Sequence, residues 1–527
     1  MLAERSQLMK KIASDNDFTD HQVTTTTESV RGDNYMGKIT TVTEEDGNKK
    51  MGLILRSAHV GKIRKQMSIH KVHLREIFLY EEDFAKFKEF QEEYRISKPF
   101  QKYAKLYATR HKIIRLVDWF RRVGKMTSVE LSAEQSQLIE KIASDNDFID
   151  HQVKAITGSV KGDNYLGKIT SVTVEDGNRK LELILKSAHV GEMRNQMPIH
   201  KAYMREIFVY EQVFAKFKEF QEEYRISEPF QSYPKLYATS DVEPKECLVM
   251  ENLRESGYKL WNRKQLMNPE HISAVLKEYA KLHAVSFAMA EKKPEEFRKL
   301  AEVMKNHIWE NDRELTATYI RSVMNQVLEF FEDDPDTTEV LEAFEKRLPD
   351  MYFDPSNDSE SFVFDHGDCW CNNLMFGYEN QDNSSVPSSV RIIDWQLSKL
   401  ASPAMDLSYF FLVHSPKEVL YDYEKYLKLY HETLSKNLRE FSCDPETLFP
   451  YSVLLEHWKK RACLGVYTAF SIVKIMLCDS EDAPDLDEVV EGGKDLMEIF
   501  NFSPKDDGVY RTRIRDLVEF SIKTGLL

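Results

Sequence analysis

The chain has 527 residues, of which 42% are hydrophobic and 30% are charged, a composition typical of globular proteins. This length is enough for two or three domains with buried cores. The formal net charge of −15 argues against a nucleic-acid-binding protein, because no basic surface dominates to neutralise phosphates.

The N-terminal residues and the cysteines indicate the expected compartment. The start, MLAERSQLMKKIASDND, has no apolar run for a secretory signal, and no stretch approaches the roughly 20 apolar residues of a membrane span. Six cysteines in so long a chain do not indicate a disulfide framework. Cys369 and Cys371 lie one residue apart, but no second Cys/His pair has the spacing of a zinc site. We therefore expect a cytoplasmic protein with reduced cysteines and no membrane span.

An internal repeat dominates the first half of the chain. Residues 7–109 align with residues 137–239 at a constant offset of 130, and 75 of these 103 positions are identical. A solenoid needs three or more small repeats, so the pattern indicates a duplicated partial domain. A chain that starts at Met126 would have 402 residues. Residues 1–125 are therefore either a fused tandem copy or an error in joining neighbouring genes.

The basic segment RHKIIRLVDWFRRVGK at 110–125 joins the two copies. Its apolar residues recur at the spacing of an amphipathic helix: Ile113, Leu116, Val117 and Phe120. A helix that packs on its own domain, a disordered linker and a helix that binds a membrane surface or a partner all remain open. We assign 1–109 to the duplicated copy and 110–134 to a linker or helix.

A β-rich region is expected at 135–252. The run KITSVTVEDGNRKLELILKSA is rich in β-formers, and the Asp176-Gly177 pair inside it is a hairpin signal. A helix is expected around 200–222, a short strand at CLVMENL, and long helices from about 270 to 347. A small β-rich lobe followed by a larger helical lobe, here 253–527, is typical of the α+β bilobal protein-kinase-like fold.

Lys186 ends the apolar strand in LELILKSAHV, a place where a lysine usually marks only the solvated end of a strand. Glu206 follows twenty residues later on an amphipathic helix, and Glu211 lies on a different face of that helix. In kinases a strand lysine and a helix glutamate pair, which holds the lysine against the α- and β-phosphates of ATP. The downstream motifs favour this interpretation for Lys186 and Glu206.

Two further segments are candidate nucleotide contacts. In KGDNYLGKITSV, Gly162 and Gly167 allow a turn whose backbone N–H groups face phosphate, with Asn164 between them; a plain hairpin turn explains the glycines almost as well. After the strand CLVME, the backbone from Glu251 to Leu253 is the predicted linker that hydrogen-bonds adenine.

The segment FVFDHGDCWCNNLMFG at 362–377 carries the strongest signal for chemistry. Asp368 and Asn373 have the spacing of the kinase catalytic loop H-x-D-x-x-x-x-N. There the aspartate accepts the hydrogen bond of the acceptor hydroxyl and the asparagine oxygen ligates a metal ion, while the histidine, here His366, braces the loop.

Downstream, the apolar strand RIIDWQ leads to Asp394, at the position of the second metal-binding aspartate of a kinase. The strands NLMFGY and SVRIIDWQ flank a loop at 380–389, so they are expected to pair as a hairpin and bring the two metal ligands together. The alternative is a solvated aspartate at a strand end beside an unrelated loop.

Together these motifs resemble the ecdysteroid kinase-like family, also called CHK kinase-like proteins, which is related to choline and aminoglycoside kinases. The resemblance covers about 135–500, and HGD-x-W-x-x-N-x-M is its most specific motif. Further matching stretches are RIIDWQLSKLASPAMDLSYFF, YAKLHAVSFAM, REIFVYEQVF and ECLVMENLRESGYKL.

The resemblance implies a bilobal kinase-like fold that uses ATP and Mg²⁺. It implies Asp368 as catalytic base, Asn373 and Asp394 as metal ligands, and Asp406 as a residue that steadies the catalytic loop. It also implies that Lys186 contacts the phosphates and pairs with Glu206. Members are typical of insects and are linked to phosphorylation of ecdysteroids and to detoxification, so the implied acceptor is a hydroxyl of an ecdysteroid or xenobiotic.

The first copy departs from this pattern at one decisive position. Arg56 stands where the second copy has Lys186, and arginine does not replace lysine as a compact phosphate contact. Glu76, the counterpart of Glu206, is retained, and Asp118 echoes Asp394 without a catalytic aspartate before it. We predict that the first copy is inactive.

The sequence bears on two other classes of protein. Against a protein kinase, Trp395 and Gln396 replace Phe-Gly, and only eleven residues separate Asp394 from Asp406, too few for a long peptide-docking segment. The remaining alternative is a weakly active pseudokinase or nucleotide-binding module. The sequence determines neither the acceptor nor the oligomeric state.

Overall fold

The structure is a computed structural model that divides into two compact units, Met1–Gly124 and Lys125–Leu527. It describes residues 22–26, 37–46, 49–58, 128–158, 167–191, 193–304, 313–353, 362–379, 384–478 and 507–527. In the first unit these residues form an antiparallel sheet in the order β1-β2-β3. Its strands are β1 (Gln22–Thr26), β2 (Gly37–Asp46) and β3 (Lys49–Ala58).

The second unit begins with a five-stranded antiparallel sheet in the order β4-β5-β6-β8-β7. Its strands are β4 (Gln152–Thr157), β5 (Gly167–Asp176), β6 (Arg179–Ala188), β7 (Leu236–Ser240) and β8 (Cys247–Glu251). The pairing of β4, β5 and β6 repeats that of β1, β2 and β3 at the offset of 130: Gly167 lies opposite Ala188 as Gly37 lies opposite Ala58. The sequence repeat is thus also a repeat of strand register.

Local sequence explains the central hairpin. Gly177, at the predicted turn between β5 and β6, has a φ of 57°, which glycine adopts without steric cost. Alternate residues of β5, Val172 and Val174, are fully buried. They belong to a core formed with α7 (Ala133–Asp145), whose N-terminus is closed by a capping box of Ser132 and Gln135.

Between β6 and β7 the chain forms helices. These are α8 (Met193–Gln196), α9 (Ile199–Phe208), a π-helical turn (Val209–Val213) and α10 (Phe214–Tyr224). The helix predicted around 200–222 is therefore present, with a π-turn inside it. Such turns often occur at functional sites.

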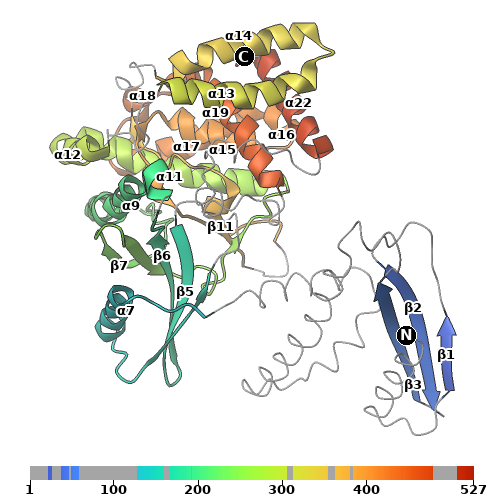
Figure 1. The fold of residues 1–527 in the computed structure, drawn as a ribbon. Helices are drawn as coiled ribbons and strands as arrows, with labels where there is room; N and C mark the ends of the chain where they lie inside the picture. The colour runs from blue at the N-terminus through green and yellow to red at the C-terminus, as the bar shows by residue number, and fades with distance from the viewer. Residues whose placement is uncertain are drawn as a thin grey trace. The chain divides into compact units, whose positions relative to one another are not determined.

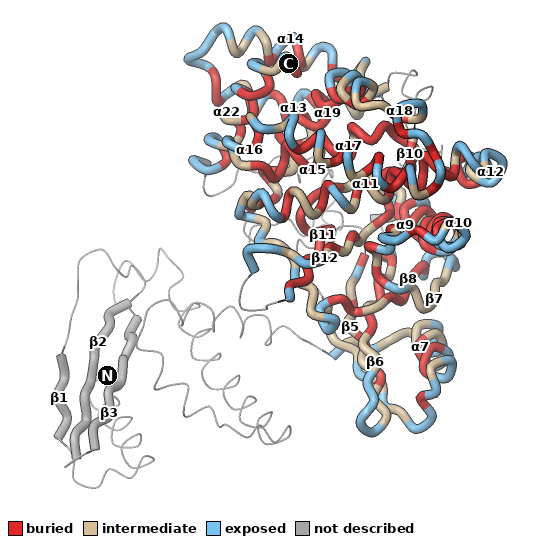
Figure 2. The backbone as a smooth tube through the Cα atoms, turned by 180° about the vertical axis from the view of Figure 1, so that it is seen from behind, coloured by how far each residue is buried: buried red, intermediate tan, exposed pale blue. Residues whose placement is uncertain are grey.

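The rest of the second unit is largely helical. Its longer helices are α11 (Pro269–Lys292), α12 (Pro294–Met304), α13 (Arg313–Leu328), α14 (Pro335–Tyr352), α15 (Pro403–His414), α17 (Tyr423–Glu440), α19 (Tyr451–Leu477) and α22 (Asp507–Thr524). The short α16 (Lys417–Tyr421) and α18 (Pro445–Leu448) connect them. In Figure 1, α11 lies between the sheet and most of the other helices. Figure 2 shows that buried backbone is concentrated in α11, α15 and α19.

Short strands lie between the sheet and the helices. β11 (Leu374–Gly377) pairs with β12 (Ser389–Ile392) on one side and with β9 (Lys259–Leu260) on the other. β10 (Val363–Phe364) pairs with β13 (Leu400–Ala401). The expected hairpin around 380–389 is therefore present.

An antiparallel sheet followed by a largely helical region confirms the predicted α+β class. None of the helices in the described ranges is both long enough and apolar enough to cross a membrane.

Candidate active site

Lys186 and Glu206 meet between the sheet and α9. Lys186 Nζ lies 2.6 Å from Glu206 Oε2, and the two side chains are 4% and 0% exposed. The same Nζ lies 2.7 Å from Asp394 Oδ1. Burial alone would lower the pKa of Lys186, but the charges of Asp394 and Glu206 outweigh it and raise that pKa above its ordinary value. The ammonium group therefore stays charged between two carboxylates.

Glu206 also fixes the chain after Asp394. Its second carboxylate oxygen accepts a hydrogen bond from the backbone N–H of Trp395 at 3.2 Å. Glu211, its rival in the sequence, is exposed and accepts a hydrogen bond from the Thr239 hydroxyl instead. The difference follows from the helical periodicity, which turns the two glutamates to different faces.

Asp394 has an unusual backbone conformation. Its φ of 69° and ψ of 67° place it in the left-handed region, which costs a residue with a Cβ of order 1–3 kcal/mol and occurs preferentially at functional sites. β12 ends two residues earlier, and the backbone N–H of Ile393 donates to the Asn373 carbonyl at 3.0 Å. The β11–β12 hairpin thereby places Asn373 beside the residue that precedes Asp394.

Asp368 is held at both carboxylate oxygens. The Asn373 side-chain amide donates to Asp368 Oδ2 at 2.8 Å, and the Tyr409 hydroxyl donates to Oδ1 at 2.9 Å. Burial and the nearby charge of Asp394 raise the pKa of Asp368, against the opposing effects of His366 and of these hydrogen bonds. The carboxyl group therefore binds a proton more readily than an ordinary aspartate.

His366 connects the loop of Asp368 to the residue that follows β12. Its Nε2 lies 3.0 Å from the Ile393 carbonyl, so this nitrogen carries the proton and donates. Its Nδ1 is then an acceptor and receives the backbone N–H of Asp368 at 3.3 Å. The imidazole thus bridges the segments that carry Asp368 and Asp394.

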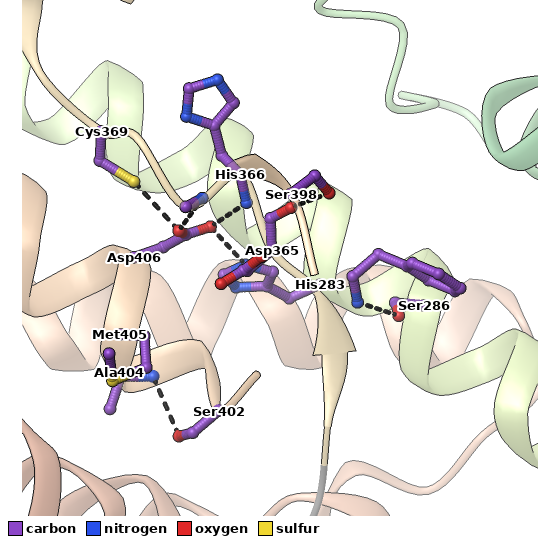
Figure 3. A network of polar contacts seen from close by, with 12 residues as sticks. His283, Ser286, Asp365, His366, Cys369, Ser398, Ser402, Ala404, Met405 and Asp406 are labelled. Atoms are coloured by element: carbon purple, nitrogen blue, oxygen red, sulfur yellow. Dashed lines mark hydrogen bonds and ion pairs between the residues drawn. The ribbon is translucent and has the colours of Figure 1, made fainter. Parts of the chain in front are cut away.

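Asp406, in the first turn of α15, holds the backbone of the same loop (Figure 3). Its carboxylate accepts hydrogen bonds from the backbone N–H groups of His366 and Gly367 at 2.8 and 3.0 Å. The Cys369 thiol and His283 Nε2 lie 3.0 and 3.3 Å from it. Burial would raise the pKa of Asp406, but His283 and His366 outweigh burial and hold it at about 2.

The residue before Asp368 has to be glycine, because there is no room for a side chain. Gly367 has a φ of 80°, and a Cβ there would lie 2.5 Å from the Leu397 carbonyl oxygen. Any side chain at this position would displace either the catalytic-loop candidate or the segment after Asp394.

A cleft opens beside these polar groups, with an empty volume of about 830 Å³ that includes space open to solvent. Lys186, Glu206, Asn373 and Asp394 line one part of it. Much of the remaining wall is apolar, from Ile169, Ile184, Met250, Leu260, Met375 and Ile393, and Asn252, Arg254 and Asn372 also line it. An apolar cleft with a few convergent polar groups is the usual form of a small-molecule site.

The predicted linker from Glu251 to Leu253 also lines this cleft. The Leu253 carbonyl accepts a hydrogen bond from the Tyr258 N–H at 2.9 Å. Within the described part of the chain, the Leu253 N–H has no protein partner, so it is a donor that a planar base can use.

Of the three residues predicted for the glycine-rich turn, the structure describes one, Gly167. Gly162 and Asn164 lie outside the described residues. Gly167 is the first residue of β5, and a Cβ there would overlap the Tyr203 hydroxyl and lie 2.6 Å from the Ser187 carbonyl. Close packing is therefore one reason for glycine at this position, and its contact with a nucleotide stays a prediction.

The donor set fits Mg²⁺. Because the amide nitrogen of Asn373 faces Asp368, its amide oxygen is left for a cation. Asp394 adds a carboxylate whose side chain is 17% exposed. Carboxylate and amide oxygens are the hard ligands that Mg²⁺ prefers.

The sequence reasoning missed Tyr409. It lies three residues after Asp406, so helical periodicity places both on neighbouring positions of α15. That spacing, in the stretch PAMDLSYF, was the available signal.

Comparison with known proteins places the chain in one family. The sequence profile of the ecdysteroid kinase-like family matches residues 161–443. No curated protein matches the chain significantly.

Among solved structures, an ethanolamine kinase from Plasmodium vivax shares 13% identity, with 74% of this chain and 89% of that chain covered and a TM-score of 0.34. A GDP complex of an aminoglycoside 2′-phosphotransferase-IIIa variant shares 9% identity, with 74% and 98% covered and a TM-score of 0.34. A glucosamine kinase shares 11% identity, with 72% and 83% covered and a TM-score of 0.29. These TM-scores are low, and the family assignment rests on the sequence profile alone.

Proposed function

The chain belongs to the ecdysteroid kinase-like family and is a small-molecule kinase; from this premise we propose that residues 126–527 transfer the γ-phosphoryl group of ATP to a hydroxyl of a small molecule, with Mg²⁺ as cofactor. One observation carries the proposal. Lys186 and Asp394 are 208 residues apart in sequence, yet their side chains are in contact at 2.7 Å at the wall of a cleft that Asn373 also lines. Phosphoryl transfer requires this convergence of a cation with oxygen ligands.

The cleft explains how the nucleotide binds. The adenine ring lies between the apolar side chains of the two lobes and receives a hydrogen bond from the Leu253 N–H. Lys186, whose position is fixed by Glu206, contacts the phosphates as a charged ammonium group.

Asn373 and Asp394 hold the metal ion through their side-chain oxygens. When bound, Mg²⁺ neutralises the charge of the phosphates and orients the transferred group. The left-handed backbone of Asp394 and the hydrogen bond from Trp395 N–H to Glu206 preorganise this ligand.

Asp368 orients the acceptor and takes its proton. The acceptor oxygen forms a bond to the γ-phosphorus while the bond from that phosphorus to the bridging oxygen of ADP breaks, and the hydroxyl proton moves to the Asp368 carboxylate. The raised pKa of Asp368 favours this proton transfer near neutral pH. ADP leaves with the negative charge.

The short connection after Asp394 favours a small acceptor. β13 and the start of α15 at Pro403 follow within ten residues, so the segment on which a protein kinase docks a peptide has no counterpart. This is the bilobal kinase arrangement adapted to a small hydroxyl compound, and the ecdysteroid or xenobiotic expected from the sequence is one such acceptor.

The test is transfer of label from γ-³²P-ATP, with Mg²⁺, to a panel that contains an ecdysteroid, choline, ethanolamine, glucosamine and an aminoglycoside. We expect at least one labelled product and its loss in Asp368→Asn, while that variant still binds ATP. ATP binding without turnover on any acceptor would instead favour the nucleotide-binding module.

A further inference from the structure

We propose that Tyr409 is a positioning residue for this reaction: its hydroxyl fixes the Asp368 carboxylate in the orientation that receives the acceptor. The inference rests on the proposed function and gives a role to a residue to which the sequence motifs assigned none.

The geometry assigns each carboxylate oxygen of Asp368 its own donor. Tyr409 donates to Oδ1 at 2.9 Å and Asn373 donates to Oδ2 at 2.8 Å. Two donors on opposite oxygens fix the rotation of the carboxylate plane, and each oxygen keeps a lone pair for the acceptor hydroxyl. With either donor removed, the plane is free to turn.

The two donors differ in what else they do. Asn373 is a proposed metal ligand, so its position is coupled to the cation. Tyr409 comes from α15, which also holds the loop backbone through Asp406 one turn earlier. One helix therefore fixes both the position of the loop backbone, through Asp406, and the rotation of the Asp368 carboxylate, through Tyr409.

α15 is a rigid support for this task. Its N-terminus is capped by Ser402, whose hydroxyl accepts the Ala404 N–H at 3.2 Å. It packs closely against α19 at Gly465, where an added Cβ would lie 2.6 Å from the Ser408 hydroxyl oxygen. Sites supported by helices are held more accurately than sites on loops.

Tyr409 acts as a donor. Burial and the charge of Asp368 raise its pKa well above the ordinary value, so the phenol stays protonated. Met405 and Tyr409 are the two residues of α15 that stay partly exposed, and they lie on the face of the helix from which the mostly buried Tyr409 hydroxyl reaches the partly exposed Asp368.

The test compares Tyr409→Phe with Tyr467→Phe in the full chain. Tyr467 is a matched control, because its buried hydroxyl on α19 has no hydrogen-bond partner among the described residues. With the acceptor that is phosphorylated fastest, we expect Tyr409→Phe to lower kcat about tenfold and leave the KM for ATP unchanged, whereas Tyr467→Phe changes neither. A Tyr409→Phe variant with the kcat of the wild type overturns the proposal, since the ring alone would then suffice.

A second measurement needs no acceptor. Unfolding of the wild type, Tyr409→Phe, Asp368→Ala and the double variant forms a double-mutant cycle. The two residues should be coupled by about a factor of ten in the unfolding equilibrium constant, as expected for a hydrogen bond to a charged group. Additive effects overturn the inference even if the protein is a kinase. Strong coupling without any phosphoryl transfer leaves the contact intact and rejects the proposed function instead.

Discussion

The two copies of the repeat have the same strand register, but they differ in a side chain of the candidate site. Gln22 pairs with Glu45 as Gln152 pairs with Glu175, and each pair of β1, β2 and β3 has an equivalent in the second copy at the same offset. At the site, however, Arg56 replaces Lys186. Register depends on turn chemistry and on the alternation of apolar residues, so it survives changes that remove a functional side chain.

The copies also differ at positions that form the core of the second one. Val174 and Val213 are 0% and 1% exposed, and their counterparts in the first copy are Glu44 and Asp83. An unpaired carboxylate is costly to bury. The first copy therefore carries substitutions that a lobe packed like the second could not accommodate cheaply.

The extent of the repeat is a third difference. In the second copy the far edge of β6 pairs with β8, for example Leu185 with Val249. The repeat ends at residue 109, before the position equivalent to the start of β8. The second copy thus has a sheet partner, a cleft wall and a candidate catalytic loop for which the repeated sequence supplies no counterpart, and we propose that only the second copy is catalytic.

The largest effect is expected when a core position of the second copy, Val213, receives the residue that the first copy has at the equivalent position, Asp83. Val213→Asp would bury an unpaired carboxylate among the side chains around the π-turn, so we expect a loss of more than about 4 kcal/mol in the free energy of unfolding. Thermal unfolding measures this, with Val213→Ala as the control for lost packing and Asp83→Val as the reciprocal change. An unaltered melting temperature in Val213→Asp would contradict the comparison.

The next largest effect concerns Asp368, which lies in the part of the chain that is not repeated. Asp368→Asn removes the proposed base, and the phosphoryl-transfer rate should fall about 10³-fold with ATP affinity kept within a few-fold. Steady-state kinetics and nucleotide titration separate the two quantities. Substantial residual activity would mean that Asp368 is not the base or that another part of the chain is active.

Lys186→Arg tests the predicted phosphate contact, which is arginine in the first copy. The guanidinium is longer and planar, so it cannot occupy the buried position between Glu206 and Asp394 in the same way. We expect a loss of about 100-fold in kcat/KM for ATP. Arg56→Lys is the matched control and should change nothing; a gain of activity there would show that the first copy is functional.

The smallest effect is expected on deletion of residues 1–125. If the second unit is the whole enzyme, a chain of residues 126–527 should keep its kcat and its ATP affinity within about twofold. The assay is the same transfer reaction with purified protein. Insolubility or loss of nucleotide binding would show that the first copy supports the second.

Much of the second unit was predictable from local patterns. The β5–β6 hairpin followed from Asp176-Gly177, and the β11–β12 hairpin from the apolar runs that flank the loop at 380–389. Glu206 was separated from Glu211 by helical periodicity alone. The π-turn after α9 was not predicted, because its sequence has the ordinary pattern of an amphipathic helix.

The sequence by itself determined the repeat, the order of strands and helices, and the residue types of the site, because turn signals and motif spacings act over a few neighbouring positions. Only the tertiary structure brought Lys186 to Asp394, set Asp394 in a left-handed conformation and placed Tyr409 on Asp368. Those contacts join residues 208 and 41 positions apart. They depend on how α9, α15 and the β11–β12 hairpin pack together, and the packing of whole elements is not encoded in any local pattern.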